Sequence, residues 1–410
     1  MDILPILSTL KRHKTAAGLI VLQIALTCAI VCNALFLIFQ RIDRISADTG
    51  MAEEALITLS LSSMARVENP EPQTRADLAA LAQVPGVVSA ALTNQYPYGR
   101  NSNNSSVRLE AGEQARSRAV AGHYTAGPGF IATSGLKLVE GRDFLPEEFV
   151  AGSSLDNNPD PRVPAVIINK HLANVLFPGE SALGKGLYVY GQQPQRVVGV
   201  LAELPSPNPG SQDDNALDTM LMPVQPSFRG GSFLIRVAPG ADPEAVLKAS
   251  AAKLLGNSPG LRRVVRDQDT MIKQRSAYYR QDRSMVLLLA GVCVGLLIVT
   301  AFGIVGLASF WVQQRTRMIG TRRALGATRG QILRYFQTEN LLLSTAGIAL
   351  GMLGAYGISL LLMSHYELPR LPLVYLPAGA LVLWALGQVA VLAPARRAAA
   401  LPPVAALRGG

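Results

Sequence analysis

Four long stretches without a charged residue constrain this chain more than any other feature. Each of them is apolar and long enough to cross a lipid bilayer, which takes about 20 residues. They are residues 15–40, 285–312, 340–364 and 371–395. Because the long polar segment 41–284 separates the first stretch from the second, we expect a membrane bundle combined with one large domain outside the bilayer.

The composition agrees with such a mixed protein. Of the 410 residues, 49% are hydrophobic, which is too many for an ordinary soluble protein and too few for one that lies wholly in the membrane. The segment 41–284 is long enough to bury a core of its own. The first apolar stretch is much longer than the apolar part of a signal peptide, about 7–15 residues, so we interpret it as a retained helix.

The net charge of +10 would suggest nucleic acid as a partner of a soluble protein. Here much of the excess lies beside the ends of the apolar stretches, which favours topology signals and contact with anionic membrane lipid over nucleic-acid binding. These basic residues are Lys11, Arg12, Lys14, Arg315, Arg317, Arg322, Arg323, Arg329, Arg334, Arg396, Arg397 and Arg408.

Basic segments next to membrane helices stay in the cytoplasm, and this rule orients the chain. The predicted fold is a membrane α-helical protein with four transmembrane helices and a large α+β external domain inserted between helices 1 and 2. The predicted segments are a cytoplasmic N-terminus with the first helix (1–40), the external domain (41–284), the second helix (285–312), a cytoplasmic loop (313–339), the third helix (340–364), the fourth helix (371–395) and a cytoplasmic tail (396–410).

The outer domain shows a weak internal repeat. Strand, helix and strand patterns occupy residues 55–61, 74–83 and 87–93, and again 232–238, 243–255 and 261–266. Asp242 and Pro243 form a typical helix start. We therefore expect two membrane-proximal βαβ-like units, at about 50–120 and 226–275, around a strand-rich insert at about 121–225.

Further elements are expected in the insert and at the exit from the domain. Strands are predicted at 163–169, 187–190 and 196–201, a short helix at 172–176, and polar turn-rich loops at 101–106 and 152–160. The charged segment 262–283 lacks strong helix breakers, and we expect it to run as one helix into the second span.

No arrangement of catalytic or metal-binding residues stands out in the sequence. The four histidines, His13, His123, His171 and His365, lack metal-ligand spacing. The cysteines lie only in apolar stretches, so the outer domain holds no disulfide, and Cys28 and Cys32 fit helix packing better than metal binding. The chain has no GxxxxGK[ST] phosphate loop. We expect a non-catalytic chain that binds no cofactor, so any energy source sits on another polypeptide.

The loop 313–339 contains the sequence TRRALGAT at residues 321–328, which predicts a short helical turn that ends near Gly326. One interpretation is a helix that docks into a partner on the cytoplasmic side, and the other is a basic stop signal. A topology signal needs charge but not the apolar pair Ala324–Leu325, so we favour docking. The candidate residues are Arg317, Met318, Gly320, Arg322, Arg323, Ala324, Leu325, Gly326 and Ala327.

Small and polar residues inside the apolar stretches predict helix contacts. Gly347, Gly351 and Gly354 permit close approach of another helix, either in a dimer or within the bundle, and the sequence does not decide between the two. Gln23 and Asn33 are expected to hydrogen-bond across helices.

Several sequence motifs resemble those of one family in the same order along the chain. The motifs are RTRMIGTRRALGATRGQIL from residue 315, PARRAAALPPVAALR from 394, FIATSGLKLVEGRDF from 130, PAVIINKHLANVLFPGESALGKGL from 164 and RVVGVL from 196. They resemble the MacB/FtsX-type permeases, the membrane subunits of the mechanotransmission (type VII) ABC transporters. The resemblance covers nearly the whole chain.

The resemblance implies a bacterial inner-membrane protein that pairs with a second permease, a copy or a paralogue, and with two ABC ATPase subunits that bind ATP. ATP-driven motion would pass through the loop to the periplasmic domain and drive efflux of antibiotics, peptides or other amphiphiles, together with a periplasmic adaptor and an outer-membrane channel. Lipoprotein extraction and FtsX-like signalling without transport are the alternatives. The family commonly has Glu where this chain has Met318, which suggests a heterodimer whose other permease supplies the acidic residue.

Overall fold

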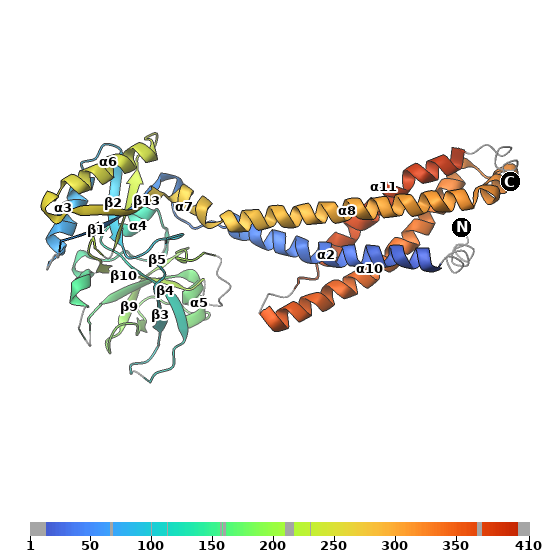
Figure 1. The fold of residues 1–410 in the computed structure, drawn as a ribbon. Coiled ribbons are helices and arrows are strands. Elements are labelled where there is room, and N and C mark those ends of the chain that lie inside the picture. Colours follow the sequence, from blue (N-terminus) through green and yellow to red (C-terminus); the bar gives the residue numbers. More distant parts are fainter. Residues whose placement is uncertain are drawn as a thin grey trace. The chain divides into compact units, whose positions relative to one another are not determined.

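The computed structural model describes residues 14–400, except 66–68, 100, 113, 156, 157, 159, 160, 210–216, 230 and 367–370. The chain divides into two compact units. The helical unit comprises Met1–Ile45 and Gln281–Gly410, and the α+β unit comprises Ser46–Arg280 (Figure 1).

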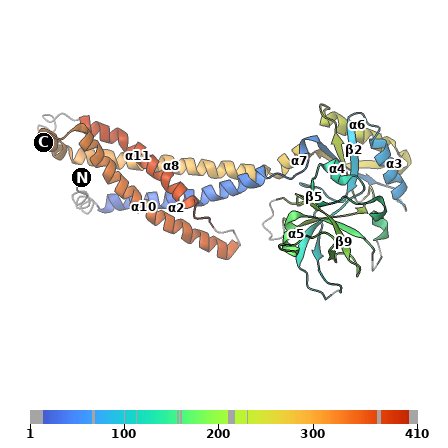
Figure 2. The same ribbon diagram turned by 180° about the vertical axis from the view of Figure 1, so that it is seen from behind.

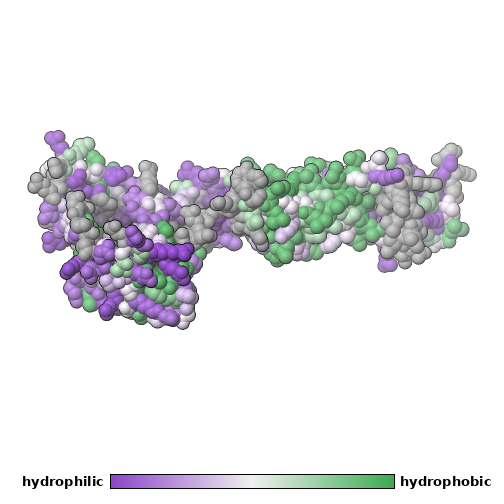
Figure 3. Space-filling view, turned by 90° about the horizontal axis from the view of Figure 1, so that it is seen from below, coloured by the Kyte–Doolittle hydropathy of each residue, from purple (hydrophilic) through white to green (hydrophobic). Residues whose placement is uncertain are grey.

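In its described residues, the helical unit contains four long helices that are apolar enough to span a membrane, which confirms the predicted fold class. They are α2 (Lys14–Ser46), α8 (Arg280–Gln314), α10 (Arg329–Tyr366) and α11 (Tyr375–Ala400), and the short helix α9 (Thr316–Ala324) lies between α8 and α10. Figure 3 shows apolar side chains covering the surface of the long helices, as lipid contact requires.

Buried apolar side chains from every long helix form one core, with Ile24, Ile304, Ile348 and Leu383 as examples from α2, α8, α10 and α11. Hydrogen bonds reinforce this packing. The Gln23 amide donates to the Val299 carbonyl of α8 at 3.2 Å, and the Asn33 amide donates to the Ala355 carbonyl of α10 at 3.2 Å. Both polar residues therefore hydrogen-bond across helices, as predicted.

The α+β unit contains a four-stranded antiparallel sheet built from the two ends of its sequence. Its elements are β1 (Leu56–Ser63), α3 (Glu71–Leu81), β2 (Val87–Thr93), β12 (Ser232–Val237), α6 (Pro243–Gly256) and β13 (Arg263–Thr270). The strand order is β13-β1-β12-β2, so each βαβ-like unit straddles a strand of the other in a split βαβ arrangement. The Asp242 carboxylate accepts a hydrogen bond from the Glu244 amide at 3.1 Å and caps α6.

The insert forms a second sheet, of mixed direction, with strand order β3-β4-β10-β7-β9-β5 and β8 paired to β9 (Figure 2). Its elements are β3 (Asn104–Val107), β4 (Ala119–Thr125), α4 (Phe130–Ser134), β5 (Leu138–Gly141), β7 (Ala165–Asn169), α5 (Lys170–Leu176), β8 (Gly186–Leu187), β9 (Gln195–Leu201) and β10 (Thr219–Met222). A small two-stranded sheet pairs β6 (Val150–Ala151) with β11 (Val224–Gln225). Single 3₁₀ turns are η1 (Glu53–Ala55), η2 (Pro146–Glu148), η3 (Gly152–Ser154) and η4 (Pro259–Leu261).

Two sequence predictions about the α+β unit are wrong. The segment 262–283 is not one helix: β13 runs to Thr270, α7 covers Met271–Tyr278, and α8 starts at Arg280. The charged residues of β13 pair with β1 in a strand of alternating exposure, and the Thr270 hydroxyl accepts from the Lys273 amide to start α7. The predicted loop at 101–106 includes most of β3, because its short polar side chains lie on an edge strand paired to β4.

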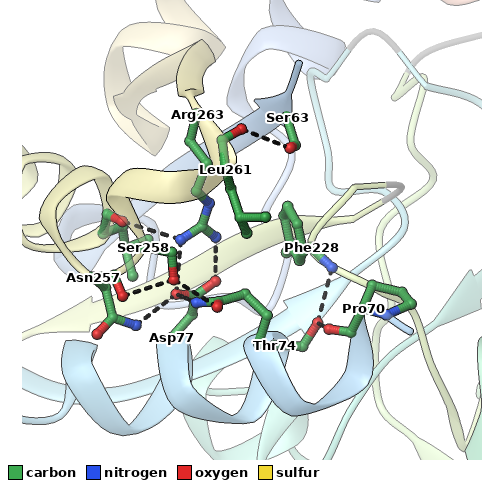
Figure 4. A network of polar contacts seen from close by, with 11 residues as sticks. Ser63, Pro70, Thr74, Asp77, Phe228, Asn257, Ser258, Leu261 and Arg263 are labelled. Atoms are coloured by element: carbon green, nitrogen blue, oxygen red, sulfur yellow. Dashed lines mark hydrogen bonds and ion pairs between the residues drawn. The ribbon is translucent and has the colours of Figure 1, made fainter. Parts of the chain in front are cut away.

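A buried ion pair joins α3 to β13 in the α+β unit (Figure 4). Both side chains, Asp77 and Arg263, are fully buried, and the Asp77 carboxylate also accepts from the Asn257 and Gln73 amides, each at 2.9 Å. The guanidinium donates further to the Leu254 carbonyl at 3.0 Å and lies 4.6 Å from the centre of the Phe228 ring. This network ties both helices of the split βαβ arrangement to its edge strand.

Candidate functional site

The predicted cytoplasmic loop folds into a helix–turn–helix. The helix α8 ends at Gln314, Arg315 precedes α9, and only residues 325–328 separate α9 from α10. Gly326 has φ +96°, a left-handed conformation that favours glycine at a helix end, and its amide donates to the Arg323 carbonyl at 3.2 Å. Thr328 and Gln331 exchange side-chain-to-backbone hydrogen bonds at 3.3 and 2.9 Å, which starts α10.

One face of α9 is fastened to the bundle. Ile319 is 2% exposed and packs in the same core as Ile332 and Phe336 of α10. The Arg322 guanidinium lies 5.0 Å from the centre of the Tyr335 ring. The Arg323 Nη1 donates to the Ala399 carbonyl at the end of α11, at 2.7 Å. These contacts hold α9 against α10 and α11.

The hinge between α8 and α9 contains a second buried ion pair. Arg315 Nη1 donates to both carboxylate oxygens of Glu339, on α10, at 3.0 and 2.8 Å. Arg315 and Glu339 are only 7% and 1% exposed, and the guanidinium lies 5.3 Å from the centre of the Trp311 ring. The pair therefore fixes the position where the chain turns from α8 into α9.

The other face of α9 ends in an exposed tip, which we define as Thr321, Ala324, Leu325 and Gly326. Leu325 is 83% exposed, more than any other large hydrophobic side chain in the described part of the chain. Arg317 is also exposed, whereas Met318 and Ala327 are half-buried and Gly320 is buried. The predicted docking residues thus divide between an exposed tip and a face that holds the helix in place.

The glycines of α10 differ in their surroundings. A Cβ at Gly347 would lie 2.8 Å from Ile24 of α2, and a Cβ at Gly351 would lie 2.5 Å from Cys28 and 2.6 Å from the Ala25 carbonyl oxygen. At Gly354 the nearest atom would be 3.8 Å away. Two of the three predicted glycines therefore sit in a close intramolecular contact of α10 with α2.

Two histidines of the insert, His123 on β4 and His171 on α5, have protein partners. The His123 ring nitrogens lie 3.1 Å from the Ser105 hydroxyl and 2.8 Å from the Tyr190 hydroxyl, and burial lowers the pKa of His123 from 6.5 to about 4. His171 lies 2.7 Å from the Asp218 carboxylate. Among the described residues there is no group of three His, Cys, Asp or Glu side chains suited to a metal ion. His13, residues 367–370 and residues 401–410 lie outside the described residues.

Sequence reasoning missed Glu339 and Trp311 as members of the site. A signal was present, because Glu339 is the only acidic residue in the arginine-rich segment 313–339. Nothing in the sequence places its partner, since Arg315 lies 24 residues away and contacts it only in the folded bundle.

Comparison with known proteins gives two family matches that together cover most of the chain. Residues 22–253 match a MacB-like periplasmic core domain, and residues 290–403 match the C-terminal part of an FtsX-like permease. The first match alone covers more than half of the chain. The chain belongs to the family of MacB-like and FtsX-like ABC transporter permeases. It is accordingly a multi-span membrane protein with a periplasmic domain.

Three relatives illustrate the similarity. An uncharacterized ABC transporter permease of Bacillus subtilis, YvrN, is 31% identical over 65% of this chain and 67% of its own length. The macrolide export ATP-binding/permease protein MacB of Chromobacterium violaceum is 30% identical over 68% of this chain and 42% of its own length. The macrolide export ATP-binding/permease protein MacB 1/2 of Paracoccus denitrificans is 30% identical over 82% of this chain and 47% of its own length. The chain thus spans less than half the length of these two MacB proteins.

Proposed function

We propose that this permease is the membrane subunit of an ABC transporter complex, in which a separate ATPase hydrolyses ATP on the cytoplasmic side. The ATPase binds the exposed tip of α9, and its closure moves α9 against the bundle. The motion changes the conformation of the periplasmic domain, which drives efflux of antibiotics, peptides or other amphiphiles. The permease itself is non-catalytic and binds no cofactor.

The observation that carries this proposal is the exposure of Leu325 on a helix whose opposite face is fastened. A docking helix needs an apolar side chain that a partner can bury, and it needs a rigid connection through which force can pass. Leu325 supplies the first, and the contacts of Ile319, Arg322 and Arg323 supply the second. A stop signal for membrane insertion would require neither feature.

The names of relatives support export as the direction of transport. Two of the relatives described above are macrolide exporters, and a further relative, of Pseudomonas entomophila, is described as a pyoverdine export ATP-binding/permease protein, 29% identical over 68% of this chain. In this proposal the permease lies in a bacterial inner membrane and pairs with a second permease, a copy or a paralogue. A periplasmic adaptor and an outer-membrane channel complete the export route.

Affinity purification of the chain from its host in mild detergent, followed by mass spectrometry, tests the proposal. We expect to recover an ABC ATPase, an adaptor and a permease. A second, different permease would support the heterodimer suggested by Met318, whereas a homodimer with stimulated ATP hydrolysis would contradict it. Recovery of a lipoprotein chaperone or a cell-wall hydrolase in place of the adaptor would contradict efflux, and absence of any ATPase would contradict the coupling role.

A further inference from the structure

The ion pair at the start of α9 lies on the same face of α10 as the contacts that fasten α9. The buried residues Ile332, Tyr335, Phe336 and Glu339 follow the three- and four-residue spacing of one helix face. Ile332 and Tyr335 are near the tip end of α9, while Glu339 contacts Arg315 at its hinge end. This face of α10 therefore contacts α9 at both of its ends.

Stability alone does not account for a charged pair in this position. Removing two charges from water is costly, and apolar side chains of similar volume often hold a buried contact equally well. The charged pair instead connects the hinge to one residue of α10, because Arg315 Nη1 contacts both oxygens of Glu339. A pair of this kind suits a hinge whose angle has to be defined.

The surroundings of the pair leave room for rearrangement. Four buried polar atoms of the described bundle have no hydrogen-bond partner: Arg315 Nη2, Trp311 Nε1, Asn340 Nδ2 and Ser344 Oγ. Trp311, Glu339 and Asn340 also line a cavity of about 20 Å³, which is space for about one water molecule. The space allows these side chains to shift as α9 turns while Arg315 and Glu339 remain in contact.

We propose that Arg315 and Glu339 are positioning residues that transmit a displacement of α9 to α10. The inference rests on the proposed function, since the displacement comes from an ATPase at the tip. When the partner pushes Leu325, α9 turns about Arg315, and the guanidinium moves the Glu339 carboxylate together with α10. Without the pair, α9 still binds the ATPase through its tip, but its hinge end is no longer held to α10, and less of its displacement reaches α10.

The test uses the full chain in lipid nanodiscs with the ABC ATPase that copurifies with it. The double variant Arg315→Met/Glu339→Met removes both charges and keeps the tip, and Arg334→Gln, an exposed arginine on α10, is the matched control. Three quantities are measured. They are the amount of ATPase that stays bound to the chain, the melting temperature of the chain, and the ATP-dependent change in hydrogen–deuterium exchange of residues 46–280. A merely structural role would alter the melting temperature without selectively removing the ATP-dependent change.

We expect the double variant to retain the ATPase while its ATP-dependent exchange change falls at least about fivefold, and we expect Arg334→Gln to match the wild type. A double variant with the full exchange change overturns the inference. If the double variant does not fold, Arg315→Gln carries the test, because it removes the guanidinium that contacts Glu339 and leaves Glu339 in place. A full exchange change in Arg315→Gln then overturns the inference. Failure of the wild type to retain any ATPase contradicts the proposed function instead.

Discussion

Asp77 with Arg263 and Arg315 with Glu339 are both buried ion pairs, but their surroundings differ. In the α+β unit, the Asp77 carboxylate accepts from Arg263, Asn257 and Gln73, and Arg263 also reaches a carbonyl. In the helical unit, Arg315 Nη2 and the nearby Trp311 Nε1 and Asn340 Nδ2 have no hydrogen-bond partner, and Trp311, Glu339 and Asn340 line a water-sized cavity. The first network leaves Arg263 Nε without a partner but is otherwise closed and suits a fixed arrangement, whereas the second is more open and suits a moving one.

Loss of Asp77 from the network of Asp77 and Arg263 has the largest expected effect on stability. Asp77→Ala leaves the Arg263 charge buried without its counterion, so we expect the α+β unit to lose about 3–5 kcal/mol of stability. Urea denaturation of the full chain, followed by pulse proteolysis within residues 46–280, measures the loss. Arg142→Gln, which breaks the exposed pair of Arg142 with Glu148, is the control and should change stability little. Equal effects of the two variants would contradict the closed-network account.

His123 is another buried polar side chain of the α+β unit, and its effect on stability depends on pH. Its pKa is about 4 in the fold because burial disfavours the charged form, against an ordinary value of 6.5. Between pH 6.5 and 4 the unfolded chain binds a proton that the fold does not, so stability is lost as the pH falls through this window. The expected loss is about 3 kcal/mol. His123→Gln should reduce the pH dependence by that amount in the same assay, and an unchanged pH profile would refute the assignment.

Gly351 lies at a close contact between α10 and α2 of the helical unit, and this contact involves no charged side chain. In Gly351→Ala the new Cβ meets Cys28 and the Ala25 carbonyl at 2.5 and 2.6 Å, so α10 and α2 must separate. We expect the bundle to lose roughly 1–3 kcal/mol. The melting temperature in detergent reports the loss. Gly354→Ala is the matched control, because its Cβ has space, and a lower melting temperature in that variant than in Gly351→Ala would contradict the close contact of α10 with α2 at Gly351.

Weakening the open pair has the smallest expected effect on stability. In Glu339→Gln the amide oxygen still accepts a hydrogen bond from Arg315, and the cavity beside position 339 has space for a water molecule that can hydrate the remaining charge, so we expect a loss of only about 1 kcal/mol. This is well below the loss expected for Asp77→Ala, and melting of the full chain measures it. A destabilisation as large as that of Asp77→Ala would erase the distinction between the closed and the open pair.

The features predicted correctly from the sequence are those that depend on residues close together along the chain. The four spans follow from uncharged stretches, and the split βαβ elements follow from alternating patterns and the Asp242–Pro243 helix start. A strand was predicted at 261–266, but the second half of β13, up to Thr270, was missed because its charges alternate in exposure along a paired strand and resemble a polar helix in composition. The tip of α9 was predicted from Leu325 and Gly326, but the Arg315–Glu339 pair was not, since only tertiary folding brings these residues together.

The affinity of the copurified ATPase for the full chain in nanodiscs tests the central claim most directly, with Leu325→Ser compared with Arg334→Gln. Both residues are exposed on the same segment, but only Leu325 belongs to the tip. If the tip is the docking site, Leu325→Ser weakens binding at least about tenfold, as expected for loss of a buried apolar anchor, and Arg334→Gln does not. Wild-type affinity in Leu325→Ser would contradict the account.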